Sequence, residues 1–110
     1  MGAVSAIPAK VRRVVLERAQ GRCEGCGNPQ ANNLHHRQFR SRGGPHTVNN
    51  LVLLCGAGNT NGCHGKAHSA DAPTGWAVSS WESPTLIPFQ HHVFGLVHLL
   101  EDGTTDGTVF

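Results

Sequence analysis

The apolar positions near the start of the chain recur with the spacing of an α-helix. They lie on one helical stripe, at Val11, Val14, Val15, Leu16 and Ala19. Pro8 suits the first turn of such a helix, where no backbone N–H is needed, and Gly21 suits the left-handed residue that ends it. The pattern therefore predicts a helix over about residues 8–20.

Beyond this helix, the apolar positions come in short runs separated by turn-forming residues. "NNLHHRQF" (32–39) and "LVLLC" (51–55) have the length of strands, and "RSRGGPHTVNN" (40–50) has the glycines, proline and polar residues of a long loop. "GAGNTNG" (56–62) predicts a second loop, and "CHGKAHSA" (63–70) predicts one or two turns of helix. Two strands and a short helix thus follow the first helix.

The character of the chain changes after Asp71. "WAVSSW" (76–81) and "HHVFGLVHLL" (91–100) predict strands, and Asp102-Gly103 predicts a turn after the second one. The apolar positions of that second segment fit a helix equally well, since they fall at Val93, Leu96, Val97 and Leu100. We expect an α+β protein: helix, strand, long loop, strand, short helix and a β-rich tail.

The composition is that of one domain with a thin core. The chain has 110 residues, which is the length of a single domain, and only 38% of them are hydrophobic and 5% aromatic. An additional cross-link would stabilise such a core, and the four cysteines could supply it. No apolar run is long enough to cross a membrane, and "MGAVSAIPAKVRR" lacks the order of a secretory signal. We expect a cytoplasmic protein, whose reduced thiols favour metal binding over disulfides.

Charge is unevenly distributed along the chain, although the net formal charge is only +2. Residues 1–68 carry all nine lysines and arginines against Glu17 and Glu24, whereas residues 69–110 carry five acids and no lysine or arginine. A basic part of this kind is typical of a nucleic-acid surface, but a solvated basic helix would give the same pattern. Charge alone leaves both interpretations open.

Four cysteines form two pairs with the spacing of a metal site. Cys23-x2-Cys26 is a turn that points two thiolates to one side, and Cys55-x7-Cys63 is a looser pair with a loop of its own. We expect all four to bind one structural zinc, with two disulfides or unrelated buried cysteines as the alternatives. Such a zinc would clamp the chain around "NLHHR" (33–37) and contribute directly to folding.

Four histidines have the spacing of a metal site with a general base. His64 and His68 are four residues apart, which on a helix places both imidazoles on one face. With one member of the pair His35-His36 they would give an ion three nitrogen ligands and leave a position for a phosphate oxygen. The other member would take a proton from water. The alternative is that His35 packs inward and His36 faces solvent.

These residues together resemble a known family. "LHHRQFRSRGGPHTVNNLVLLC" followed by "CHGKAH" resembles the HNH endonucleases, whose core is a β-hairpin plus a helix around one divalent ion, the ββα-metal fold. The framing cysteines resemble those of zinc-bound members, many of them phage-encoded. The resemblance covers about residues 22–68 and implies a single HNH nuclease domain over residues 1–110. Its expected parts are a helix at about 8–20, a zinc and ββα-metal core at about 22–70, and a β-rich tail at 71–110.

The resemblance also implies a role for each matching residue. His36 would be the general base that activates water, and Asn50 would fix the loop that orients it. One catalytic divalent ion (Mg, Mn, Ni or Zn) would stabilise the 3′ leaving oxygen, so that hydrolysis leaves a 5′-phosphate. The ligands of this ion would be His35, His64 and His68. The arginines beside the site would contact DNA phosphates, and they are Arg37, Arg40 and Arg42.

The resulting hypothesis is a phage-encoded, metal-dependent endonuclease that nicks or cleaves double-stranded DNA. A zinc-containing DNA-binding module without catalysis would explain the cysteines and the basic charge, but it leaves the histidines and Asn50 without a role. A third hypothesis is an accessory subunit of a phage terminase or packaging complex, whose acidic tail docks a basic partner. The complete histidine and asparagine set favours the nuclease. Sequence preference, cleavage mode and oligomeric state are not indicated by the sequence.

Overall fold

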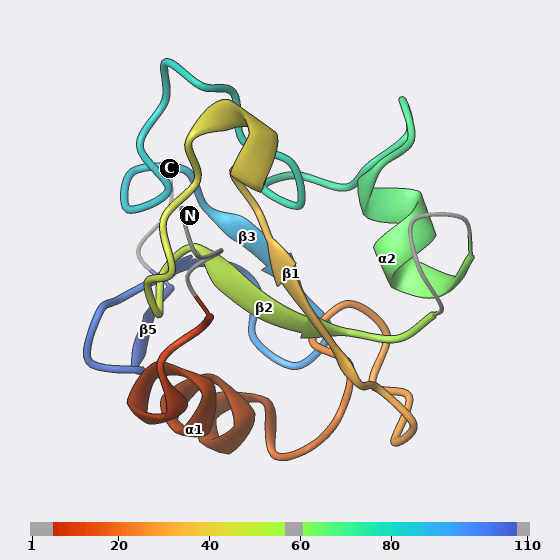
Figure 1. The fold of residues 1–110 in the computed structure, drawn as a ribbon. Coiled ribbons are helices and arrows are strands. Elements are labelled where there is room, and N and C mark those ends of the chain that lie inside the picture. Colours follow the sequence, from red (N-terminus) through yellow and green to blue (C-terminus); the bar gives the residue numbers. More distant parts are fainter. Residues whose placement is uncertain (1–5, 57–60, 108–110) are drawn as a thin grey trace.

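The computed structural model describes residues 6–56 and 61–107, and within them it has two antiparallel sheets and two α-helices (Figure 1). The expected α+β class is confirmed. The elements in chain order are α1 (Ala9–Ala19), β1 (Asn33–His36), the 3-10 helix η1 (Arg40–Arg42), β2 (Leu51–Leu54), α2 (Gly62–Ala67), β3 (Phe89–His91), β4 (Gly95–Leu99) and β5 (Thr105–Asp106).

Helix α1 ends where the sequence predicts, but its buried face differs from the predicted apolar stripe. Gln20 and Gly21 both adopt left-handed conformations, with φ of 54° and 71°, which stops the helix. Val15 and Ala19 are buried, whereas Leu16 is exposed and Arg18 is buried in its place. Arg18 is buried because its guanidinium pairs with Glu24, with Nε 2.7 Å from Oε1 and Nη2 3.0 Å from Oε2.

The β1–β2 hairpin forms the centre of the molecule, with α1 and α2 at its two ends (Figure 1). The strands are antiparallel and pair His36 with Leu51 and His35 with Val52. All four residues of β2 are buried, which explains its continuous apolar sequence. In β1 only His35 is buried, so the two neighbouring histidines face different surroundings, as alternation along a strand requires.

Helix α2 is brought back against the end of β2 by a close contact between two glycines. A Cβ on Gly62 would lie 2.5 Å from the Cα of Gly56, and Gly62 has a φ of 62°, so no larger residue fits there. This closure places Cys63 beside Cys55. The loop predicted between the two cysteines lies mostly outside the described residues, since 57–60 are not described.

The tail contains strands, but not all of those predicted. Residues 76–81 form turns and contribute only an isolated bridge between Val78 and Gln38, so the predicted strand is wrong. Residues 91–100 divide into the end of β3, a turn at 92–94 and β4, which excludes the alternative of a helix. The turn predicted at Gly103 is confirmed and connects β4 to β5.

The tail completes the core rather than standing apart from it. One cluster of buried side chains combines the tail's Trp76, Phe89 and Val97 with Val52 and Leu54 of β2. A smaller cluster joins Val15 of α1 to the other end of the hairpin. Among the described residues, no helix is long and apolar enough to cross a membrane.

Candidate active site and metal centres

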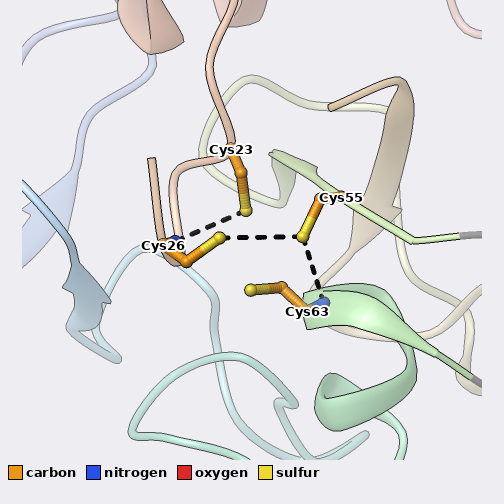
Figure 2. Close-up of side chains that lie close together, drawn as sticks. All are labelled: Cys23, Cys26, Cys55 and Cys63. Carbon is orange, nitrogen blue, oxygen red and sulfur yellow. Dashed lines mark hydrogen bonds between the residues drawn. The ribbon is translucent and has the colours of Figure 1, made fainter. Parts of the chain in front are cut away.

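The four cysteines converge on one point (Figure 2). Cys23 and Cys26 come from the turn after α1, Cys55 follows β2, and Cys63 lies in the first turn of α2. All four sulfurs lie within 4.8 Å of one another. The cluster therefore joins the N-terminal segment to both ends of the connection between β2 and α2.

The geometry of this cluster fits a tetrahedral zinc. Thiolates about 2.3 Å from such an ion lie about 3.8 Å apart. The Sγ atoms of Cys26 and Cys55 are 3.7 Å apart, and the thiols are free rather than joined in disulfides. The backbone N–H groups of Cys26 and Cys63 donate to the sulfurs of Cys23 and Cys55 at 3.4 Å, which would support negative charge on the sulfurs.

Three histidines form a second cluster of possible ligands. His35 comes from β1 and His64 from α2, and their ligand nitrogens lie with that of His68 within 4.8 Å of one another. The spacing predicted that His68 lies within the helix. It is instead the residue that caps the C-terminal end of α2. The ring centroids of the three are 5.0–5.3 Å apart. The predicted ligand set is thus brought together, with three donors where the cysteine cluster has four.

His35 is held in the state that a metal ligand needs. Its Nε2 lies 2.7 Å from the carbonyl oxygen of Trp76, and because a carbonyl only accepts, Nε2 must carry the proton. Nδ1 is then left with its lone pair, as in histidine ligands whose other nitrogen donates to a carbonyl. Burial lowers the pKa of His35 to about 3, so the ring is neutral at pH 7. The Trp76 carbonyl was not indicated by the sequence.

His36 lies on the wall of an open pocket next to the histidine cluster. The pocket has a volume of about 420 Å³ and is lined by Leu34, His35, His36, Phe39, Arg40, Ser41, His64 and His68. Nε2 of His36 is 2.9 Å from Nδ1 of His46, a loop residue to which the sequence gave no role. Burial, with the nearby His46 and Arg40, lowers the pKa of His36 to about 4. The ring is therefore neutral at pH 7 and can accept a proton, and a phosphate beside it would raise this pKa.

Asn50 ties the loop after His36 to the start of β2. Its Oδ1 accepts from the backbone N–H of Gln38 at 2.7 Å, and its Nδ2 donates to the carbonyls of Gln38 and Pro45 at 3.1 and 2.9 Å. The side chain is fully buried. Asn50 thus bonds to residues near both ends of the loop that carries η1.

Arg37 does not lie where a DNA contact would require, and that expectation is wrong. The residue is 0% exposed, and its guanidinium donates to the carbonyl oxygens of Gly75, Asn49, Pro84 and Ile87 at 2.5–3.1 Å. Burial lowers its pKa to about 9, so it is still charged at neutral pH. Arg37 therefore fastens the tail to the hairpin. The sequence could not show this, because the acceptors lie 12 to 50 residues away.

The other two predicted arginines are exposed near the pocket. Arg40 lines it and donates to the Gly44 carbonyl at 2.7 Å. The guanidinium of Arg42 lies over the ring of Phe39, 4.4 Å from its centroid. Both side chains are exposed to solvent, although Arg42 is already engaged with an aromatic ring.

The fold and the two clusters define a class of protein. A β-hairpin and the helix after it assemble four thiols at one point and three imidazoles at another, beside an open pocket. A scan against protein-family models matches the HNH endonuclease family over residues 23–70. Neither the curated proteins nor the solved structures gave a match. The family supports nuclease activity in general and DNA as the substrate.

Proposed function

We propose that the protein is a metal-dependent endonuclease that hydrolyses phosphodiester bonds of double-stranded DNA at the pocket beside β1. The observation that carries this proposal is the meeting of His35, His64 and His68 within 4.8 Å at the wall that also contains His36. Three neutral nitrogen donors leave room on an ion for a phosphate oxygen. The match of residues 23–70 to the HNH endonuclease family supports the same chemistry.

Each histidine of the pair has a separate task in this proposal. His35, His64 and His68 would hold one divalent cation, which would polarise the phosphate and stabilise the leaving oxygen. His36 would remove the proton from the attacking water, because it is neutral and lies on the pocket wall. Imidazole donors favour zinc, nickel or cobalt in affinity, whereas magnesium and manganese are the more usual ions for phosphate chemistry.

The residues around His36 would orient its imidazole toward the attacking water. Its hydrogen bond to His46 fixes the ring from one side, and Asn50 fixes the backbone two residues on. Arg40 would hold a backbone phosphate at the mouth of the pocket. The four cysteines would bind a structural zinc that holds α2 in its position against the end of β2, so that His64 faces His35. The core shared by the hairpin and the tail supports a single domain over the described residues.

Relaxation of supercoiled plasmid tests the proposal. The purified protein, its metals first removed and the zinc restored, is given magnesium, manganese or nickel, and so is the variant His36→Ala. We expect the wild type to nick the plasmid, and His36→Ala to be about 10²- to 10⁴-fold slower, the usual contribution of a general base. The variant should keep its affinity for the catalytic ion.

A matched control is His98→Ala, because His98 lies on β4 and does not line the pocket. This variant should nick like the wild type. Equal activity of the wild type and His36→Ala would contradict the role of His36. If neither protein cuts with any metal, a zinc-containing DNA-binding module or an accessory subunit would be the better hypothesis.

A further inference from the structure

His68 differs from the other two histidines of the site in how it is supported. His35 lies in a paired strand and His64 inside α2, whereas His68 follows the helix and is exposed to solvent. Its backbone N–H still bonds the carbonyl of Gly65 at 3.1 Å, but that bond does not orient the ring. An exposed side chain samples several rotamers, so an additional contact is needed to hold the imidazole toward its neighbours.

Phe39 supplies such a contact. Its ring stacks on that of His68, with centroids 4.4 Å apart and an angle of 23° between the planes. The guanidinium carbon of Arg42 lies 4.4 Å from the same ring centroid. The ring of Phe39 also meets His35 edge-on at 5.8 Å. One aromatic side chain therefore touches two of the three possible ligands and one cation.

The backbone of Phe39 is itself well fixed. Its carbonyl accepts from the N–H groups of Arg42 at 2.8 Å and Gly44 at 3.0 Å, which closes the 3-10 turn. The residue before it, Gln38, is bound on both backbone groups by Asn50. The ring is thus presented from a tight turn that is anchored to Asn50, the residue before β2, and it lines the pocket.

We propose that Phe39 is a positioning residue of the histidine centre: its stacked ring holds His68 in the orientation of a third metal ligand and so sets the affinity for a divalent cation. The inference rests on the proposed function only in taking the three histidines as one cation site. Preorganisation of this kind strengthens binding because less side-chain freedom is lost when the ion arrives. Phe39 itself need not touch the ion or the DNA.

Titration calorimetry with Ni²⁺ alone tests this, on protein whose cysteine cluster is loaded with zinc and whose zinc content is measured before and after. Phe39→Leu should bind Ni²⁺ at least about tenfold more weakly, as expected for the loss of a supporting residue around a metal. Phe39→Tyr keeps the ring and should bind like the wild type. Phe94→Leu removes an aromatic ring that does not line the pocket and should also leave the affinity unchanged.

The decisive comparison is the double variant Phe39→Leu/His68→Ala. If the ring acts through His68, the double variant should bind Ni²⁺ no more than about threefold more weakly than His68→Ala alone, since coupled residues are not additive. The proposal would be overturned if the effects of the two substitutions on Ni²⁺ affinity were fully additive. It would also be overturned if Phe39→Leu bound Ni²⁺ as tightly as the wild type, or if the wild type took up no Ni²⁺. Because no DNA is present, a protein that fails to nick plasmid can still pass this test, and an active nuclease can fail it.

Discussion

The cysteine cluster and the histidine cluster both combine residues of the hairpin region and α2, yet they differ in the number of ligands and in their access to solvent. Four sulfurs converge at one point, with Cys23 and Cys55 buried, so a tetrahedral ion there has no free position. Three imidazoles converge at the other, beside a pocket of about 420 Å³. A closed set of donors suits an ion that stabilises the fold, and an open set suits an ion that receives a substrate.

The charged side chains near the two clusters also fall into a buried group and an exposed group. Arg18, Glu24 and Arg37 are buried and use their hydrogen bonds within the protein, whereas Arg40 is exposed on the wall of the pocket. Residue type therefore says little about role in this molecule. What separates a structural arginine or metal ligand from a functional one is whether its remaining bonding capacity faces solvent.

The largest expected effect is the loss of the closed cluster. Cys23→Ser should release the zinc and unfold the domain, because binding by structural thiolates contributes about 10–16 kcal/mol, as much as the whole stability of a small domain. His64→Ala removes a ligand of the open cluster and should leave the fold nearly unchanged while abolishing nicking. Circular dichroism and zinc content measure the difference. A folded Cys23→Ser protein with an unaltered melting temperature would contradict a structural role for the cysteines.

A smaller effect separates the two arginines. Arg37→Met should lower the free energy of unfolding by roughly 3–5 kcal/mol, because several buried carbonyls lose a charged donor at once. Arg40→Met should change it by less than about 1 kcal/mol. Urea denaturation of both variants with zinc present makes the comparison.

Arg40→Met should instead weaken DNA binding and reduce the slope of log affinity against log salt by about 0.9, the value for one phosphate contact. The binding is measured by anisotropy of a labelled duplex in the His36→Ala background, where the DNA stays intact. If Arg40→Met binds as tightly as its parent, Arg40 does not contact phosphate.

The smallest of these effects concerns two neighbouring asparagines. Asn50→Ala should lower stability by about 1–3 kcal/mol and, in protein that is still folded, slow nicking by at least about tenfold, because His36 loses its support. Asn49→Ala is the matched control: Asn49 is also buried, but its carboxamide bonds Thr47 and Thr85 instead of Gln38. Its stability loss should be similar and its nicking rate normal. Equal slowing in both variants would remove the special role of Asn50.

The sequence predicted the parts of the site that depend on local spacing. The turn of Cys23 and Cys26, the paired histidines at the end of a strand and the short helix with His64 all follow from patterns within a few residues. Asn50 came from the resemblance to HNH endonucleases, and its bonds to Gln38 agree with the expected position.

The parts that sequence reasoning missed depend on how the tail packs against the hairpin and on how the loop between β1 and β2 folds. Arg37 is buried because residues 75–87 fold over the end of β1, and no periodicity reveals which carbonyls they will offer. The Trp76 carbonyl on His35 has the same origin. His46 lies ten residues from His36 in an irregular loop, so only the folded loop shows that they meet. The strand predicted at 76–81 does not form, because these residues contact the hairpin through an isolated bridge between Val78 and Gln38 instead of pairing along it.

The most direct test of the account is stepwise metal addition to metal-free protein, with folding and plasmid nicking followed in the same sample. The account predicts that one equivalent of zinc restores the fold without nicking, and that manganese or nickel added afterwards starts nicking in the wild type but not in His64→Ala. Full nicking with one equivalent of zinc, unchanged in His64→Ala, would contradict the division between a closed structural centre and an open catalytic one.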